Sequence, residues 1–314
     1  MTDFFYDIYL LIRDKNHFLS KIRFYSFLRL LIRSCANILL PIYYKITSNN
    51  EEYKIKSAYN GVPRLIVSMT SFPARISKVW IVIETILRQK HKPDVIFLWL
   101  SKEQFPTIES VPQNLQKLCR RGLKIVLEDG DLRSHKKYYY AMKKFPNDII
   151  VTIDDDIIYK SDFLNTLYQS YTNTPKAVHC RYAHEILYDE KARLLPYVKW
   201  IENKQKSLKN KNLFFGSGGG TLFPPQVLYK DVLKIDLALK LCGTADDIWL
   251  NTMCRLNHTD IVLIDTDHLI FPIMNLWDSK LASINIENQN DIQIKSIVNY
   301  YQLKLGINPF TQLY

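Results

Sequence analysis

Glycine and cysteine are scarce in this chain of 314 residues, which has 9 glycines and 5 cysteines. The cysteines are scattered, odd in number and free of C-x-x-C spacing, so neither a disulfide framework nor a zinc site is indicated. Reduced thiols of this kind are typical of a cytosolic protein. Three of the few glycines stand together as Gly218, Gly219 and Gly220. We interpret this cluster as a local requirement of the backbone rather than as general flexibility.

The N-terminus lacks the basic start, apolar run and small-residue cleavage site of a signal peptide, so none is predicted. Between positions 23 and 37 the polar residues recur every three or four positions, which predicts a helix with a narrow polar stripe and a broad apolar face. These polar residues are Arg23, Ser26, Arg29, Arg33 and Asn37. Pro41 is expected to end or bend the helix.

The predicted basic helix leaves two interpretations of residues 20–45. Two arginines near its middle argue against a membrane span, because each costs about 2.5–3.5 kcal/mol at the bilayer centre. A broad apolar face on a basic helix suits the membrane interface, which would make the protein peripheral on the inner face of the cell membrane. Alternatively, the face packs on the protein's own body or on a second copy.

Lysine and arginine outnumber the acidic residues by 42 to 31, which gives a formal net charge of +11. Such a charge suits nucleic acid, an anionic membrane surface or a phosphate-bearing substrate, and it also fits a merely soluble basic surface. No segment combines dense basic residues with stacking aromatics, and no zinc-finger spacing occurs. Nucleic acid is therefore not expected as a partner.

The chain divides into an extension over residues 1–60, which ends in a polar linker, and a catalytic domain over 61–314. In the first half of that domain, 61–160, predicted strands at 64–69, 95–100, 123–127 and 148–153 alternate with helices at 76–87, near 115 and at 134–144. This alternation predicts an α/β fold with a mostly parallel sheet and helices on both faces. Ligands of such sheets bind beyond the carboxyl ends of the strands.

The second half, 161–314, is less regular. A strand is expected at 177–181, a helix at 246–256, a strand at 261–264 and a final helix at 291–301.

Three aspartates, Asp154, Asp155 and Asp156, directly follow the apolar strand at 148–153. Adjacent like charges raise one another's pKa or recruit a cation. A few oxygen ligands suit Mg²⁺ or Mn²⁺, which bind through one or two carboxylates together with substrate phosphates. The alternative is an acidic surface turn or a helix N-terminus that favours negative charge. The buried strand before the triplet favours the metal site.

The segment I-I-V-T-I-D-D-D-I-I-Y at 149–159 resembles the D-x-D motif of GT-A glycosyltransferases, which transfer sugars from nucleoside diphosphates. It is most similar to bacterial polysaccharide enzymes related to glycosyltransferase family 2, and the resemblance covers residues 62–291. It implies a GT-A fold, Mn²⁺ or Mg²⁺ as cofactor, and a nucleoside diphosphate sugar as donor, most commonly a UDP-sugar. It also implies a glycan or lipid-linked glycan acceptor in cell-surface polysaccharide synthesis.

By this resemblance Asp154 would face the ribose or base of the nucleotide, and Asp156 would bind the metal between the two phosphates. Asp155 matches the variable middle position of the motif and has no firm role.

The resemblance also assigns roles to one turn and one helix in the first half of the catalytic domain, 61–160. Thr70, Ser71 and Pro73 match the turn that cradles the nucleotide base. Lys136 and Lys137 match a nucleotide-contacting helix, where a lysine would balance the diphosphate charge. The alternative for these lysines is a solvated basic helix start.

Gly218 and Gly219 match the family's glycine loop beside the donor sugar, where backbone N–H groups approach the ligand closely. A plain flexible turn is the alternative. Asp246 and Asp247 match the acidic pair at a helix start that supplies the general base, although glutamate is commoner at the first position. We expect Asp247 to be the base and Asp246 to bind or orient the acceptor. Two acids that cap a helix N-terminus are the alternative.

A late histidine often completes the metal shell in this family, and His268 is the candidate. Tyr197, Trp200 and Trp249 are candidates to stack on sugar rings, with a place in the core as the alternative.

Two other classes of protein compete with the transferase. A phosphatase of the haloacid-dehalogenase type needs D-x-D-x-[TV] after its first strand, but here the fifth position is Ile158 and the motif follows a later strand. A sugar nucleotidyltransferase begins with a glycine-rich basic loop, which this chain lacks after its first predicted strand. A non-catalytic sugar-binding protein on the same scaffold is the second rival, because a fold does not guarantee activity.

Overall fold

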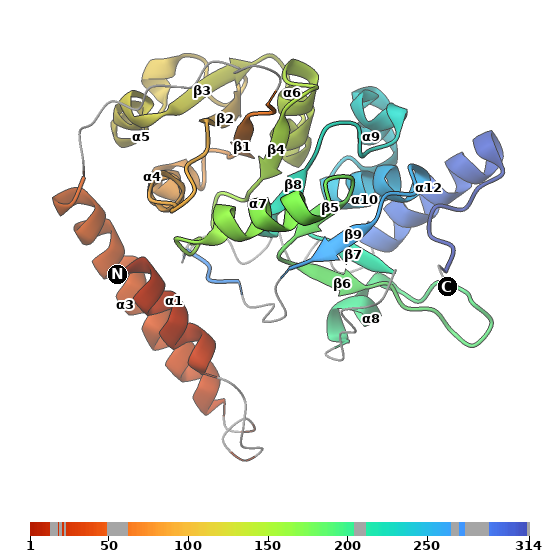
Figure 1. Cartoon of the computed structure of the whole chain (residues 1–314), viewed down its shortest axis with the longest axis horizontal. Coiled ribbons are helices and arrows are strands. Elements are labelled where there is room, and N and C mark those ends of the chain that lie inside the picture. Colours follow the sequence, from red (N-terminus) through yellow and green to blue (C-terminus); the bar gives the residue numbers. More distant parts are fainter. Residues whose placement is uncertain are drawn as a thin grey trace.

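A computed structural model describes residues 1–12, 18, 21, 23–48, 62–203, 212–264, 270–273 and 289–312. Its centre is a seven-stranded sheet of order β3-β2-β1-β4-β8-β5-β9, in which β8 alone runs against its neighbours. Helices flank the sheet, and two N-terminal helices stand beside the body (Figure 1). The expected α/β class, a mostly parallel central sheet flanked by helices together with an N-terminal helical extension, is confirmed.

Four parallel strands form the first half of the sheet. They are β1 (Leu65–Thr70), β2 (Val95–Ser101), β3 (Leu123–Glu128) and β4 (Ile149–Thr152), joined through α4 (Ile76–Leu87), α5 (Gln113–Leu118) and α6 (Lys136–Lys144). Strand β2 is buried throughout, as expected for a parallel strand covered on both faces. Successive β1 residues face opposite layers: Val67 packs in the layer of α4, and Ile66 in the layer of Ala141 on α6.

The second half of the sheet reverses direction at β8 (Thr221–Phe223), which lies between β4 and β5 (Val178–Cys180). Thr221 at the start of β8 is opposite Thr152 at the end of β4. The loop that precedes β8 therefore lies at the carboxyl end of β4. Strand β9 (Ile261–Leu263) completes the sheet, and β6 (Ala183–Glu185) pairs with β7 (Leu213–Phe215) in a separate two-stranded sheet.

The helices of the second half are α7 (Phe163–Asn173), α8 (Tyr197–Glu202), α9 (Ile235–Cys242), α10 (Asp246–Leu256) and α12 (Asn290–Leu305). Short 3₁₀ turns are η1 (Ile108–Ser110), η2 (Cys119–Arg121), η3 (Arg133–His135), η4 (Ser217–Gly219) and η5 (Lys230–Leu233). The sequence correctly predicted α10, α12, β5 and β9. It gave no expectation for α7, α9, β6, β7 or β8.

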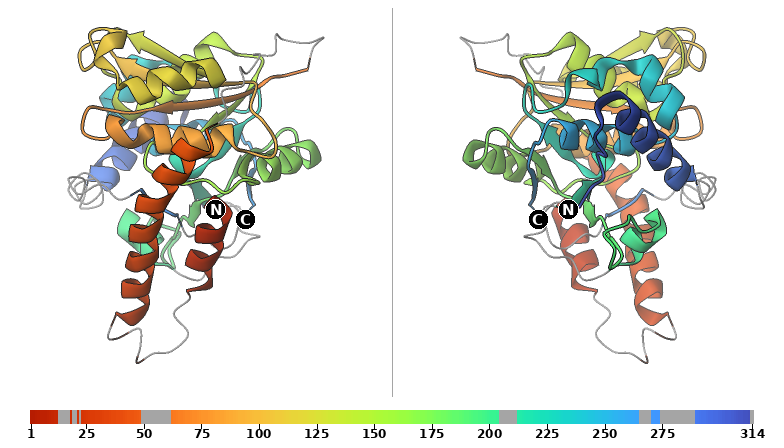
Figure 2. Two further views of the ribbon diagram at one scale, coloured as in Figure 1. Left: turned by 90° about the vertical axis from the view of Figure 1, so that its left-hand side faces the viewer. Right: turned by 90° about the vertical axis from the view of Figure 1, so that its right-hand side faces the viewer.

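The N-terminal extension is a helical hairpin of α1 (Thr2–Leu11) and α3 (Phe24–Ile46), which Figure 2 shows projecting beyond the body. By length and composition α3 is apolar enough to cross a membrane. Pro41, which was expected to end or bend this helix, does not end it, because α3 continues to Ile46. Leu40 and Tyr44, on either side of the proline, are fully buried, and this packing holds the last turns in place.

Candidate functional site

The acidic triplet lies at the carboxyl end of β4, and its middle member points into the protein. Asp155 is 7% exposed, accepts a 2.5 Å hydrogen bond from Ser71 Oγ and is 2.9 Å from Arg75 Nη1. Burial raises the pKa of Asp155, while Arg75 and Ser71 oppose that rise. The predicted base-cradling residue Ser71 thus anchors the triplet to the turn after β1, and Asp155 is a structural member of the motif.

The outer two aspartates remain accessible. The side chain of Asp154 is 40% exposed and that of Asp156 is 27% exposed. Arg75 Nη1 is 2.9 Å from Asp156 Oδ2 as well as from Asp155. This arginine, to which the sequence assigned no role, therefore places one positive charge beside two neighbouring carboxylates and offsets part of their mutual repulsion.

The glycine cluster forms η4 and packs directly on the triplet. The backbone N–H of Asp154 donates to the carbonyl of Gly218 over 3.0 Å, and Tyr159 Oη donates to the same carbonyl over 2.7 Å. A Cβ atom at Gly218 would lie 1.8 Å from the Asp154 carboxylate, so no other residue fits without displacement. A Cβ atom at Gly219 would likewise lie 2.7 Å from the Cβ atom of Tyr182. These contacts explain the local need for glycine.

The acidic pair begins α10 on the opposite side of this loop. Ser217 Oγ donates to Asp246 over 2.6 Å, and the Ser217 backbone N–H donates to Asp247 Oδ1 over 2.7 Å. Ser217 therefore orients both carboxylates, although the sequence gave it no role within the glycine segment. The reversal at β8 brings Ser217 to this edge of the sheet, because its carbonyl accepts a 2.7 Å hydrogen bond from Thr152 at the end of β4.

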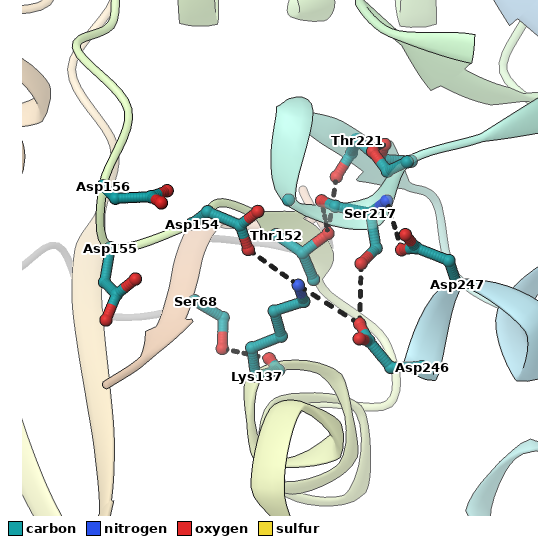
Figure 3. Close-up of polar contacts among 12 residues, drawn as sticks. Ser68, Lys137, Thr152, Asp154, Asp155, Asp156, Ser217, Thr221, Asp246 and Asp247 are labelled. Carbon is teal, nitrogen blue, oxygen red and sulfur yellow. Dashed lines mark hydrogen bonds and ion pairs between the residues drawn. The ribbon is translucent and has the colours of Figure 1, made fainter. Parts of the chain in front are cut away.

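Lys137 joins the triplet to the pair, as the dashed contacts in Figure 3 show. Its Nζ lies 2.8 Å from Asp154 Oδ1 and 3.2 Å from Asp246 Oδ2, and its side chain is only 6% exposed. Burial alone would lower the pKa of Lys137, but the negative charges of Asp154 and Asp246 outweigh burial and raise it. The lysine is therefore a fixed buried cation between two groups of carboxylates.

The two acids of the pair have different protonation behaviour. Burial alone would raise the pKa of Asp246, but Lys137 and His135 outweigh it, so the pKa falls below its ordinary value. Burial and the neighbouring charge of Asp246 raise the pKa of Asp247 to about 6. Asp246 is buried, whereas Asp247 is partly exposed. Asp247 is thus the member whose protonation state can change near neutral pH and which a ligand can reach.

The other predicted residues are less central. Lys136 forms an ion pair with Asp131. Thr70 Oγ1 donates to the carbonyl of Trp99 over 2.7 Å, and Pro73 is exposed beside the Ser71 turn. His268 lies outside the described residues. Tyr197, Trp200 and Trp249 are buried and pack in the hydrophobic core of the second half, in agreement with the alternative stated for them.

The donor set fits a metal that is held partly by a substrate. Within the described ranges, no group of three or more His, Cys, Asp or Glu residues is placed to hold an ion alone. Asp154 and Asp156 are two accessible carboxylates at one turn, which matches the one or two carboxylates that Mg²⁺ takes beside phosphate oxygens. The residues that the structure describes therefore form no cage of protein ligands of the kind that holds a structural Ca²⁺ or Zn²⁺ ion.

Comparison with solved structures finds distant likenesses. A mannosyltransferase from Pyrobaculum calidifontis, in complex with GDP-Man and Mn²⁺, is 13% identical with a TM-score of 0.48, over 90% of this chain and 77% of that one. A 4-diphosphocytidyl-2C-methyl-D-erythritol synthase from Anaerococcus prevotii is 15% identical with a TM-score of 0.42, over 77% of this chain and 100% of that one. A CMP:2-keto-3-deoxy-manno-octonic acid synthetase complexed with CTP is 14% identical with a TM-score of 0.38, over 65% and 90%.

No protein-family model and no curated protein matches the chain. At these identities and TM-scores, the likenesses do not distinguish sugar transfer from nucleotide transfer. The assignment of function therefore rests on the residues of the site.

Proposed function

We propose that this protein transfers a sugar from a nucleoside diphosphate to an acceptor hydroxyl, with inversion at the anomeric carbon. The observation that carries the proposal is the Lys137 bridge, which places an accessible carboxylate of metal-binding type, Asp154, in one network with the acid pair at the start of α10. Two acid groups with separate protonation behaviour at one site are typical of an enzyme that needs both charge stabilisation and a base.

Asp154 and Asp156 would hold Mg²⁺ or Mn²⁺ together with the diphosphate, and the ion would neutralise charge on the departing nucleoside diphosphate. Asp154 would also face the nucleotide. Gly218 and Gly219 would bring the backbone close to the donor sugar. Lys137 would act by holding Asp154 and Asp246 in place, because its buried ammonium group is already committed to those carboxylates.

In the transfer step, Asp247 would take the proton from the acceptor hydroxyl. The acceptor oxygen would form a bond to the anomeric carbon while the bond from that carbon to the diphosphate oxygen breaks, and the electron pair would leave with the nucleoside diphosphate. A general base of this kind contributes typically about 10²–10⁴-fold to the rate. Asp246 would orient this base through Ser217, which contacts both carboxylates.

The substrate classes follow from the family resemblance and remain part of the proposal. They are a UDP-sugar or another nucleoside diphosphate sugar as donor and a glycan or lipid-linked glycan as acceptor, in the synthesis of a cell-surface polysaccharide. A cytoplasmic location fits the five free cysteines. Nucleic acid is not among the proposed partners.

The test begins with a thermal-shift screen of nucleotide sugars with and without Mn²⁺, because the correct donor raises the apparent stability in proportion to RT ln(1 + [L]/Kd). The Asp247→Asn protein should then bind this donor and Mn²⁺ normally in calorimetry but lose transfer by about 10²–10⁴-fold. Asp236→Asn, which changes an exposed aspartate on the neighbouring helix α9, is the matched control.

Near-normal turnover by Asp247→Asn would remove this residue from the role of base. Release of pyrophosphate from a nucleoside triphosphate and a sugar phosphate, in place of release of a nucleoside diphosphate, would identify a nucleotidyltransferase. Release of phosphate from simple esters would identify a phosphatase. Donor binding without any turnover across a broad acceptor panel would identify a sugar-binding protein.

A further inference from the structure

The N-terminal hairpin exposes apolar side chains along the whole length of α3. They are Phe24, Phe27, Leu30, Leu31, Ile38, Leu39, Ile42 and Ile46. At about 100° per residue these positions cover about half of the helix circumference. Ala36, Leu40 and Tyr44, which are fully buried, lie on the opposite side. The exposed apolar face of α3, defined by the eight residues above, is therefore too broad for the narrow seam of a two-stranded coiled coil.

The arginines of α3 do not interrupt this face. Arg29 donates from Nε and Nη2 to the carbonyl of Ile12 over 3.2 and 3.0 Å, so it points towards the end of α1. Arg33 is four residues further on and shares that side of the helix. The cost of burying an arginine in lipid therefore does not apply to the exposed apolar face of α3.

Basic side chains gather where α3 meets the body. A cavity of about 630 Å³ is lined by Ser48, just after the helix, and by Lys117, Arg120 and Arg121 from α5 and η2. In the part of the chain that the structure describes, Glu84 pairs with Arg121, while Lys117 and Arg120 have no acidic partner. Burial lowers the pKa of Lys92, and the positive charges of Arg121 and Arg88 lower it further.

We propose that α3 lies in the plane of an anionic membrane surface, with its exposed apolar face in the lipid and the basic cavity beside it on the headgroups. In the left-hand view of Figure 2, α3 runs from the body to beyond its lower edge, on the side turned towards the viewer. The helix is about 34 Å long, and its apolar residues extend from the first turn to the last, so its whole length can contact the membrane interface. A helix with a broad apolar face and adjacent basic groups is typical of interfacial binding. The inference does not depend on the reaction proposed above.

Binding is tested with the full chain and vesicles of phosphatidylcholine with or without phosphatidylglycerol, by co-sedimentation. Leu31→Glu/Ile38→Glu should reduce partition into anionic vesicles more than tenfold, and Lys117→Gln/Arg120→Gln should reduce it about tenfold. Matched controls carry the same changes elsewhere on exposed positions, Ile292→Glu/Leu303→Glu and Lys176→Gln/Lys191→Gln. Binding should also weaken at high salt.

An exposed cysteine on α3 can be labelled to measure how deeply the helix lies in the bilayer. Cys35 is exposed on α3 among the apolar residues, and Cys119 is the other exposed cysteine. Burial raises the pKa of Cys180, Cys242 and Cys254, which should keep these thiols unreactive. In the Cys119→Ser protein, an environment-sensitive fluorophore on Cys35 should brighten with anionic vesicles. Nitroxides near the lipid headgroups should quench it more strongly than nitroxides at the bilayer centre.

Three results would overturn the proposal. The first is equal binding of the Leu31→Glu/Ile38→Glu protein and its control. The second is stronger quenching at the bilayer centre, which would identify a spanning helix. The third is a dimer in light scattering that the glutamate substitutions dissociate, without any vesicle binding by the unmodified chain. That result would show that a second copy covers the exposed apolar face of α3.

Discussion

The site at the end of β4 and the hairpin of α1 and α3 reverse the usual distribution of side chains in opposite ways. At the site a lysine and several carboxylates are buried together, whereas the hairpin leaves large apolar side chains in contact with solvent. Soluble proteins rarely bury charges without partners or expose broad apolar surfaces. By the two proposals above, the first departure marks a ligand site and the second a membrane-binding surface. The buried charged side chains depend on one another for their stability, whereas the exposed apolar side chains do not.

Removal of the Lys137 charge should have the largest effect. In Lys137→Met, the carboxylates of Asp154 and Asp246 lose their shared cation, and breaking such a buried pair costs about 3–5 kcal/mol. Chemical denaturation should show this loss in the free energy of unfolding. The Lys137→Met/Asp246→Asn protein removes one of the stranded charges and should recover part of the stability. Equal losses in the single and double variants would contradict mutual dependence.

Two neighbours on α3 provide the sharpest contrast within the hairpin. Leu40 is 0% exposed and Leu39 is 44% exposed. Leu40→Ala should lower the free energy of unfolding by about 2–5 kcal/mol, because it leaves a cavity in the core. Leu39→Ala should change it by less than about 0.5 kcal/mol. Similar losses from the two substitutions would show that the hairpin is more fully packed in solution than described above.

Gly218→Ala should have an intermediate effect. The new Cβ would lie 1.8 Å from the Asp154 carboxylate, so one of the two must move, at a cost of about 1–3 kcal/mol. Differential scanning calorimetry would measure this loss, and the same movement should weaken donor binding. The loss should shrink when Asp154→Ala is added, because the second substitution removes the atoms that clash. Full additivity of the two substitutions would argue against the contact.

The smallest expected effect is a dependence on pH. Only ionised Asp247 accepts a proton, so kcat/KM should fall about tenfold per pH unit below its pKa of about 6 and level off above it. A raised pKa in the folded protein has the opposite consequence for stability. The stability that the protonated form of Asp247 contributes to the folded protein is fully present below pH 3.8, which is the ordinary pKa of an aspartate. It is lost as the pH rises through about 6. A flat profile between pH 5 and 7 would exclude this assignment.

The sequence predicted the parallel half of the sheet because its strands are long apolar runs, as in the V-I-F-L-W-L of β2. It did not predict β8, because the three residues of this strand carry no periodicity. The position of the glycine loop at the end of β4 depends on β8, so it was not predicted either. The helix α1 was also missed, because its tyrosines Tyr6 and Tyr9 become a buried face only against partners far along the chain.

The same limit applies to the site. Asp154, Asp156 and Asp247 were chosen for their chemistry and their places after a strand or at a helix start, and the structure brings these segments together. Lys137 bridges Asp154 to Asp246, which lies 109 residues after the lysine in sequence, and no local pattern reports this contact. Arg75 and Ser217 were missed for the same reason, since their importance comes from contacts with distant carboxylates.

The contacts that hold α1 have a consequence for synthesis on the ribosome. Asp3 accepts a 2.8 Å hydrogen bond from the Ser161 backbone, and Tyr9 stacks on Phe271 at 4.8 Å between ring centroids. Helix α1 is therefore synthesised well before the partners that hold it. Phe271 follows Tyr9 by 262 residues, so at about 5–20 residues per second this delay lasts roughly 13–52 seconds. During that time the nascent chain presents this apolar segment to chaperones and to any nearby bilayer before the sheet is complete.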